Sequence, residues 1–174
     1  MTAASLDAPR TLTVANKLLS LRGEIRVEDG SGDTAYVAKG QFAFFPTWRV
    51  YRSGAEVATI RRKVLAIRPT WLVHPDAGDF QIRRKLLAFR RRYYAVGGAH
   101  DGATLTGNVF DLSFQVQLQG RSLARASGRI LTLRDQHSVQ ILAASAEDEL
   151  LVVTAMVVLQ LERRDEAGQH RDED

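Results

Sequence analysis

A repeat of 23 residues constrains the fold of this chain more than any other sequence feature. Residues 42–50 (FAFFPTWRV) align with residues 65–73 (LAIRPTWLV), and Ala, Pro, Thr, Trp and Val recur at the same places. A further copy follows around residues 87–93, and an earlier one begins at residues 19–21. Repeats of this length are supersecondary units that pack against their neighbours. Four consecutive units of this chain therefore share one plan.

Within each unit, apolar residues recur every second position, as in the pairs Trp48/Val50 and Trp71/Val73. This spacing is typical of β-strands with one buried face. Turn sequences such as Ser53-Gly54 separate the runs. Two strands fit into one unit, and connections this short join antiparallel neighbours, because a parallel crossover needs a dozen or more residues. The sequence therefore predicts a mainly β fold, a long antiparallel meander that closes into a barrel to protect its edges.

The repeated prolines predict where strands end, because proline donates no hydrogen bond to a ladder. We expect residues 42–44 and 48–50 to lie on consecutive strands joined near Pro46. By the same argument, residues 65–67 and 71–73 should lie on consecutive strands joined near Pro69.

The C-terminal region departs from the strand pattern. Between residues 150 and 161 only Thr154 and Gln160 are not apolar, and Ser145 with two following carboxylates resembles a helix N-cap. The valines in this run would also suit a strand, but the cap and the all-round apolarity favour a helix. A helix that is apolar on every side is buried on every side. We therefore expect a helix enclosed by the barrel, ending near residue 161.

Positive charge is concentrated in residues 61–92, which carry ten basic and two acidic residues, a net charge of +8 in a chain of net charge +4. Such a segment could bind phosphates of lipid or nucleic acid. It could equally be a solvated face, because arginine is abundant throughout the chain. The candidate phospholipid-binding residues are Arg61, Arg62, Lys63, Arg83, Arg84, Lys85, Arg90, Arg91 and Arg92.

The spacing inside these clusters predicts a local irregularity. Ile60 and Leu65 are both apolar but five residues apart, so a straight strand would place them on opposite faces. A β-bulge within residues 61–63, and another within 83–85, would resolve the conflict and turn the basic side chains outward. Because the two clusters are repeat-equivalent, we expect them to lie near one another on the barrel surface.

The sequence offers little support for catalysis. It has no cysteine, none of its four histidines stands in a metal-binding pattern, and no nucleophile or nucleotide-binding motif is present. We therefore expect no enzymatic activity, no metal and no cofactor. Nucleic acid is a poor fit as partner, because few aromatic residues accompany the basic ones. The longest apolar run has twelve residues and a membrane-spanning helix needs about 20, so we expect no transmembrane segment.

Several motifs together resemble the LURP-one-related branch of the tubby C-terminal-like superfamily. The resembling segments, in order, are residues 17–21, 25–30, 54–65, 107–110 and 147–159. The resemblance implies a closed barrel of about 12 strands around a central C-terminal helix. It also implies binding of phosphoinositides through basic residues on the barrel surface, which tubby proteins show.

The sequence and the resemblance lead to one domain over residues 12–162, preceded by a flexible segment 1–11 and followed by a charged tail 163–174. The expected function is a non-enzymatic binding module for acidic phospholipid headgroups at a membrane surface. The alternative is a structural or regulatory platform for a protein partner, and a protein with an acidic surface is one candidate. The N-terminus lacks the features of a signal peptide, so we expect a cytoplasmic location that allows peripheral contact with a membrane.

Overall fold

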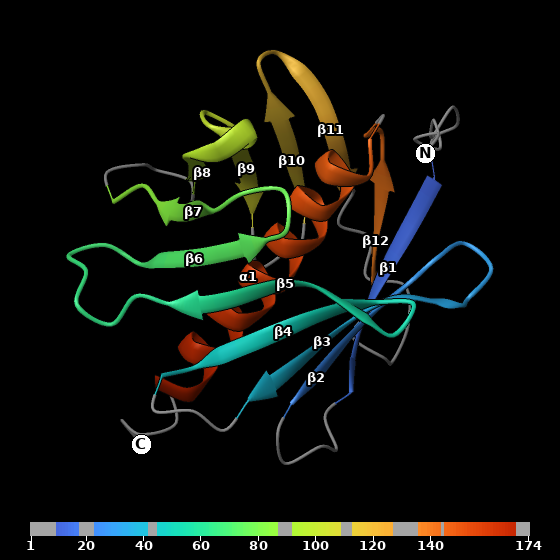
Figure 1. The fold of residues 1–174 in the computed structure, drawn as a ribbon, viewed down its shortest axis with the longest axis horizontal. Coiled ribbons are helices and arrows are strands. Elements are labelled where there is room, and N and C mark those ends of the chain that lie inside the picture. Colours follow the sequence, from blue (N-terminus) through green and yellow to red (C-terminus); the bar gives the residue numbers. More distant parts are fainter. Residues whose placement is uncertain are drawn as a thin grey trace.

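The structure, a computed structural model, describes residues 10–17, 23–41, 45–86, 92–108, 113–126, 136–143 and 145–169. These residues form twelve strands, one short 3-10 helix and one α-helix (Figure 1). The strands are β1 (Arg10–Lys17), β2 (Glu24–Glu28), β3 (Thr34–Gln41), β4 (Thr47–Arg52), β5 (Ala55–Arg62), β6 (Thr70–Pro75), β7 (Phe80–Arg84), β8 (Arg92–Val96), β9 (Thr104–Asn108), β10 (Ser113–Leu118), β11 (Arg121–Ala126) and β12 (Gln136–Ile141). The 3-10 helix is η1 (Gly98–His100) and the α-helix is α1 (Ala146–Gln169).

The strands form a closed antiparallel barrel in which each pairs with its neighbours in sequence, and β1 closes the ring by pairing with β12. Buried and less buried positions alternate along the strands; in β10, for example, Phe114, Val116 and Leu118 face the core. The predicted antiparallel barrel is confirmed. Its register follows from the alternation, because a slip by one residue would turn every core side chain to solvent.

Helix α1 runs through the barrel (Figure 1). The backbone N–H of Asp148 donates to Ser145 Oγ at 3.1 Å, which is the predicted N-cap. Every side chain from residue 151 to residue 162 is buried, and the Thr154 hydroxyl donates to the carbonyl of Leu150. The predicted central helix is therefore present, and strand side chains from around the ring pack against it in one core.

Three sequence-based expectations need correction. The helix does not end near residue 161 but continues to Gln169, so residues 163–169 are helical rather than part of a frayed tail. Polar residues in this extension have partners on the strands: Asp165 pairs with Arg62, and the Arg164 guanidinium lies 5.8 Å from the Trp48 ring centroid. The helix therefore continues beyond the apolar run because polar contacts with the strands, instead of apolar packing, hold residues 164 and 165 in place.

The second correction concerns residues 65–67, which form a loop and no strand. Strand β5 ends at Arg62 and β6 begins at Thr70, directly after Pro69, so the proline does stand at a strand boundary. Pro46 likewise precedes β4, while residues 42–44 lie outside the described residues. Leu65 therefore has no place in the core, and its conflict of phase with Ile60 does not arise.

The third correction follows from the second. No bulge falls within residues 61–63 or 83–85 of the described chain; the register shifts in its ladders lie beside Val27, Val50 and Val116. Alternation instead continues to the end of β5 and β7. As a consequence Arg62 and Arg84 point toward the barrel interior, where an outward direction was predicted.

Candidate functional site

The nine candidate basic residues fall into three groups. Arg62 and Arg84 point into the end of the barrel, and Arg90 and Arg91 lie outside the described residues. The other five lie on the outer surface or in the adjoining connections: Arg61, Lys63, Arg83, Lys85 and Arg92. The strand register therefore separates residues that are adjacent in sequence, because neighbouring side chains of a strand lie on opposite faces.

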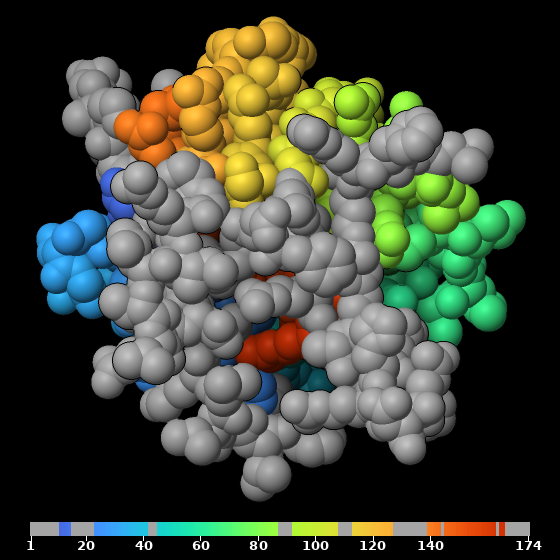
Figure 2. Space-filling view, turned by 180° about the vertical axis from the view of Figure 1, so that it is seen from behind, coloured from blue at the N-terminus to red at the C-terminus, as the bar shows by residue number. Residues whose placement is uncertain are grey.

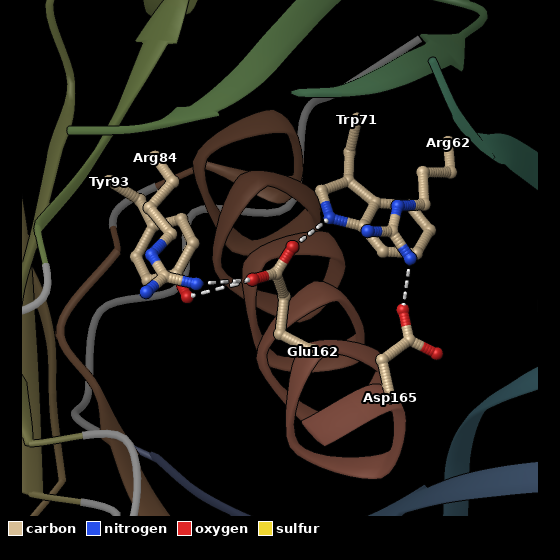
Figure 3. A network of polar contacts seen from close by, with 6 residues as sticks. All are labelled: Arg62, Trp71, Arg84, Tyr93, Glu162 and Asp165. Atoms are coloured by element: carbon tan, nitrogen blue, oxygen red, sulfur yellow. Dashed lines mark hydrogen bonds and ion pairs between the residues drawn. The ribbon is translucent and has the colours of Figure 1, made fainter. Parts of the chain in front are cut away.

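The inward-pointing arginines meet carboxylates of α1 (Figure 3). Glu162, a buried residue, accepts a hydrogen bond from Trp71 Nε1 at 2.9 Å, and its Oε2 lies 3.5 Å from Arg84 Nη1 and 3.4 Å from the Tyr93 hydroxyl. Arg62 pairs with Asp165 and stacks at 5.9 Å over the Trp71 ring. These contacts join β5, β6, β7 and β8 to the helix, so both arginines have a structural role.

The outward residues of the two clusters lie on the same side of the barrel. The Lys63 N–H donates to the Thr70 carbonyl at 2.9 Å, and Thr70 pairs across the next ladder with Arg83. One row further toward the strand ends, the Lys85 N–H donates to the Arg92 carbonyl at 2.8 Å. Strands β5 and β7, which flank β6, and the connections that follow them thus carry basic side chains close together on one side of the barrel.

Beside this basic surface lies a groove of about 580 Å³. Its floor consists mainly of outward positions on β8, β9 and β10, and its basic residues come from β8 and from the connections β5–β6 and β7–β8. The lining residues are Arg68, Lys85, Arg92, Tyr93, Tyr94, Thr104, Thr106 and Gln117. None of these is acidic. The groove combines three positive charges with side-chain hydroxyl and amide groups, which is the donor set that an anion requires.

Arg68 is held at the groove by its neighbours. Its Nη1 donates to the Tyr94 hydroxyl at 2.9 Å, although 26 residues separate the two in sequence. Tyr94 faces outward from β8 and pairs with Thr104 of β9. Because only one guanidinium nitrogen is engaged in this hydrogen bond, the remaining N–H groups can donate to a ligand in the groove.

A second hollow, of about 490 Å³, continues the surface toward β11 and shares Arg92 and Thr106 with the groove. Its lining adds Gln115 and Arg125, which lie in the same row of cross-strand partners as Arg92 and Thr106. None of its described lining residues is acidic. The two hollows together extend a positively charged surface across four strands.

Sequence reasoning missed most of the groove. Arg68 belongs to the basic segment 61–92, but the candidate residues predicted from the sequence include neither Arg68 nor Tyr94, Thr104 and Thr106. The Thr-Leu-Thr alternation at residues 104–106 does indicate two outward hydroxyl groups on one strand. Their position opposite Arg92 depends on the ladder between β8 and β9, which the sequence does not reveal.

Charge also differs between the two ends of the barrel. Antiparallel strands place alternate connections at opposite ends, so the connection β5–β6 (residues 63–69) and the described part of β7–β8 (residues 85–86) lie at the end where α1 finishes. We call this the loop end. The opposite end, where α1 begins, carries exposed carboxylates at Asp33, Asp76, Asp79, Asp101 and Glu147. Among the described connections of the loop end there is no carboxylate, and Asp165 of α1 is paired with Arg62.

Two further structural observations bear on the class of protein. Among the described residues, no three metal-binding side chains gather into a cluster. No helix of the described residues has the length and apolarity that a membrane crossing requires. The fold and the site define a single closed β-barrel that encloses its own C-terminal helix and carries a basic groove on its outer wall.

Comparisons with known proteins place this chain in a family. The sequence model of the LURP-one-related family matches residues 10–160, so the chain belongs to the LURP-one-related family. A crystal structure of a protein from Arabidopsis thaliana superposes with a TM-score of 0.64 at 16% sequence identity, over 90% of this chain and 93% of that chain. This likeness shows the shared fold. Among curated proteins none matches this chain.

Proposed function

We propose that this protein is a non-catalytic binding module that holds the anionic headgroup of a phospholipid in the groove between Arg68, Lys85 and Arg92. The observation that carries the proposal is the composition of the groove: its described lining includes three basic residues and four hydroxyl-bearing residues, and no carboxylate. A phosphate group offers several acceptor oxygens and a high charge, so it matches both the positive charge and the donors. The family resemblance to phosphoinositide-binding tubby proteins supports the same ligand class.

The size of the groove is also compatible with a headgroup. Small-molecule sites commonly occupy roughly 300–1,000 Å³, and the groove has about 580 Å³. Each basic residue near an anionic membrane contributes about 1 kcal/mol, so a few residues together support reversible attachment. Anionic lipids are enriched in the cytoplasmic leaflet, and we accordingly propose peripheral attachment on that side of a membrane.

The test is vesicle co-sedimentation at low and high salt, with phosphatidylcholine vesicles that either contain or lack a phosphoinositide. We expect binding only to the anionic vesicles and a decrease at high salt, because exposed charges are screened. The variant Lys85→Glu should weaken binding at least about fivefold, as the loss of one such contact implies.

Lys39→Glu is the matched control. Lys39 is an exposed lysine on β3, on a part of the barrel distant from the groove, and its substitution changes the net charge by the same amount. It should bind nearly as the native protein does. Equal losses for Lys39→Glu and Lys85→Glu would indicate a general charge effect and contradict a site in the groove.

A further inference from the structure

The connection β5–β6 exposes apolar side chains that the barrel does not cover. Leu65 is 93% exposed and Ile67 is 97% exposed, so neither contributes to the core, and Val64 beside them is 58% exposed. The connection projects at the left edge of the view in Figure 1. In Figure 2, turned by 180°, the same segment of the chain stands out in green at the right edge. Exposed apolar side chains that lie together, with polar residues around them, mark an interaction surface.

The neighbouring connections of the loop end carry further apolar residues. Leu86, after β7, is 51% exposed, and Phe45, before β4, is 46% exposed. Basic residues flank these apolar ones in the sequence: Lys63 precedes Val64, Arg68 follows Ile67, and Lys85 precedes Leu86. The loop end therefore combines protruding apolar side chains with positive charge.

We propose that the connection β5–β6 inserts Leu65 and Ile67 into the interface of an anionic lipid bilayer, while the adjacent groove holds a headgroup. This inference rests on the proposed function, which supplies the anionic headgroup as the ligand. It adds a hydrophobic anchor and defines how the barrel is oriented relative to the membrane. Arg68 links the two parts, since it directly follows Ile67 and also lines the groove through its hydrogen bond to Tyr94. A headgroup bound beside Arg68 brings the preceding loop to the depth of the acyl chains.

Charge complementarity favours a bilayer as the occupant. The described connections of the loop end contain Lys63, Arg68 and Lys85 and no carboxylate, whereas exposed carboxylates gather at the opposite end, at Asp76 and Asp79 for example. An anionic surface attracts the first end and repels the second, so it orients the barrel with the connection β5–β6 toward the lipid. Interfacial binding strength grows with buried apolar area and with attraction to anionic lipids together.

The shape of the loop end favours a bilayer over a protein partner. A stable protein interface buries about 800 Å² on each side in a continuous, complementary surface. Leu65 and Ile67 are instead almost completely exposed side chains on a projecting loop, with charged residues on both sides. A fluid interface accommodates such protruding side chains without a preformed pocket, because the lipid chains adapt to them.

The first experiment reads the depth of the loop directly. The chain has no cysteine, so a single Ile67→Cys substitution can carry an environment-sensitive fluorophore at one site. We expect a blue shift and quenching by lipid-borne quenchers upon addition of phosphatidylcholine vesicles that contain a phosphoinositide. Ala77→Cys, exposed at the opposite end of the barrel, is the matched control and should show no shift. A silent probe at residue 67 on vesicles that bind the protein would overturn the insertion.

The second experiment separates the anchor from the groove. Leu65→Asp and Ile67→Asp should each weaken vesicle binding at least about tenfold, since each removes the burial of a large apolar side chain. Both should leave the melting temperature and the affinity for soluble inositol trisphosphate unchanged. Lys85→Glu should weaken binding to both the vesicles and inositol trisphosphate.

The possible failures differ from one another. Unchanged vesicle binding of Leu65→Asp and Ile67→Asp would overturn the anchor and leave the proposed headgroup site intact. Vesicle binding that depends on Leu65 but is equal for neutral and anionic lipid, without affinity for inositol trisphosphate, would support the anchor and contradict the headgroup site. A native protein that self-associates through this loop, and becomes monomeric as Leu65→Asp, would overturn the bilayer as occupant.

Discussion

Trp71 and Glu162 are joined by a hydrogen bond of 2.9 Å between the indole Nε1 and a carboxylate oxygen, across 91 residues of sequence. Trp71 belongs to the 23-residue repeat, and Glu162 follows the apolar run of the helix. Both residues are buried. Since a buried carboxylate is costly unless it is paired, the bond from the indole and the contact with Arg84 explain how the helix can place a charge at this point.

Replacing Glu162 should destabilise the barrel. Glu162→Ala removes the acceptor of Trp71 and the partner of Arg84, and breaking a buried pair on one side costs about 3–5 kcal/mol. Asp165→Ala is the matched control, because its pair with Arg62 is partly exposed and such pairs contribute about 0–1 kcal/mol. Urea unfolding of both variants measures the difference. Equal free energies of unfolding for the two variants would contradict a central role for Glu162.

A charge in the middle of the helix should prevent folding. Met156 is 1% exposed inside the barrel, and an unpaired carboxylate there costs more than the roughly 5–15 kcal/mol by which domains are stable. We expect Met156→Asp to be insoluble or unfolded by circular dichroism. Met156→Leu preserves volume and polarity and should cost less than about 1.5 kcal/mol. A soluble Asp variant that unfolds cooperatively would argue against the enclosed helix.

Gly107 should not tolerate a side chain. Its φ is 150°, and a Cβ atom at this position would lie 2.1 Å from the Ser113 carbonyl oxygen and 2.6 Å from the Phe114 Cα. Because both contacts are backbone atoms of the paired strand, Gly107→Ala must separate β9 from β10. We expect a large decrease in the melting temperature.

Gly120→Ala is the control for the glycine prediction. Gly120 also has a positive φ, of 81°, but a Cβ atom there would meet nothing within 4 Å. Its substitution should cost only the conformational strain of about 1–2 kcal/mol. Similar melting temperatures for the two alanine variants would show that the close approach at Gly107 is unimportant.

The hydroxyl of Tyr94 should matter for binding more than for stability. Tyr94→Phe removes the acceptor of Arg68, which lies at the surface, so the free energy of unfolding should change by less than about 1 kcal/mol. With Arg68 no longer held at the groove, we expect weaker binding of inositol trisphosphate by isothermal titration. Tyr51→Phe, on the distant strand β4, should bind as the native protein does. An unchanged affinity of Tyr94→Phe would show that Arg68 needs no positioning.

The antiparallel barrel and its central helix could be predicted from local patterns in the sequence. The alternation of Trp71 and Val73 is a local pattern, and so is the apolar run of residues 150–161, which only Thr154 and Gln160 interrupt; each pattern specifies which faces of its own segment must be buried. Closure follows, because a helix segment that is apolar on every side must be enclosed, and a continuous meander of strands can enclose it as a barrel. The positive charge of residues 61–92 could also be predicted from the sequence, because it depends only on which residues the segment contains.

The roles of the charged and apolar residues in that segment depend instead on the three-dimensional arrangement of the strands. Arg61 and Arg62 are adjacent residues of the same type, so the sequence does not distinguish them. At the end of β5, Arg62 points inward and pairs with Asp165, 103 positions away, while Arg61 is exposed. Leu65 matches Phe42 in the repeat and yet lies on an exposed loop, because β5 ends before it. Side-chain direction depends on where a strand ends, and pairing depends on which distant residue lies opposite, so neither property is contained in a local pattern.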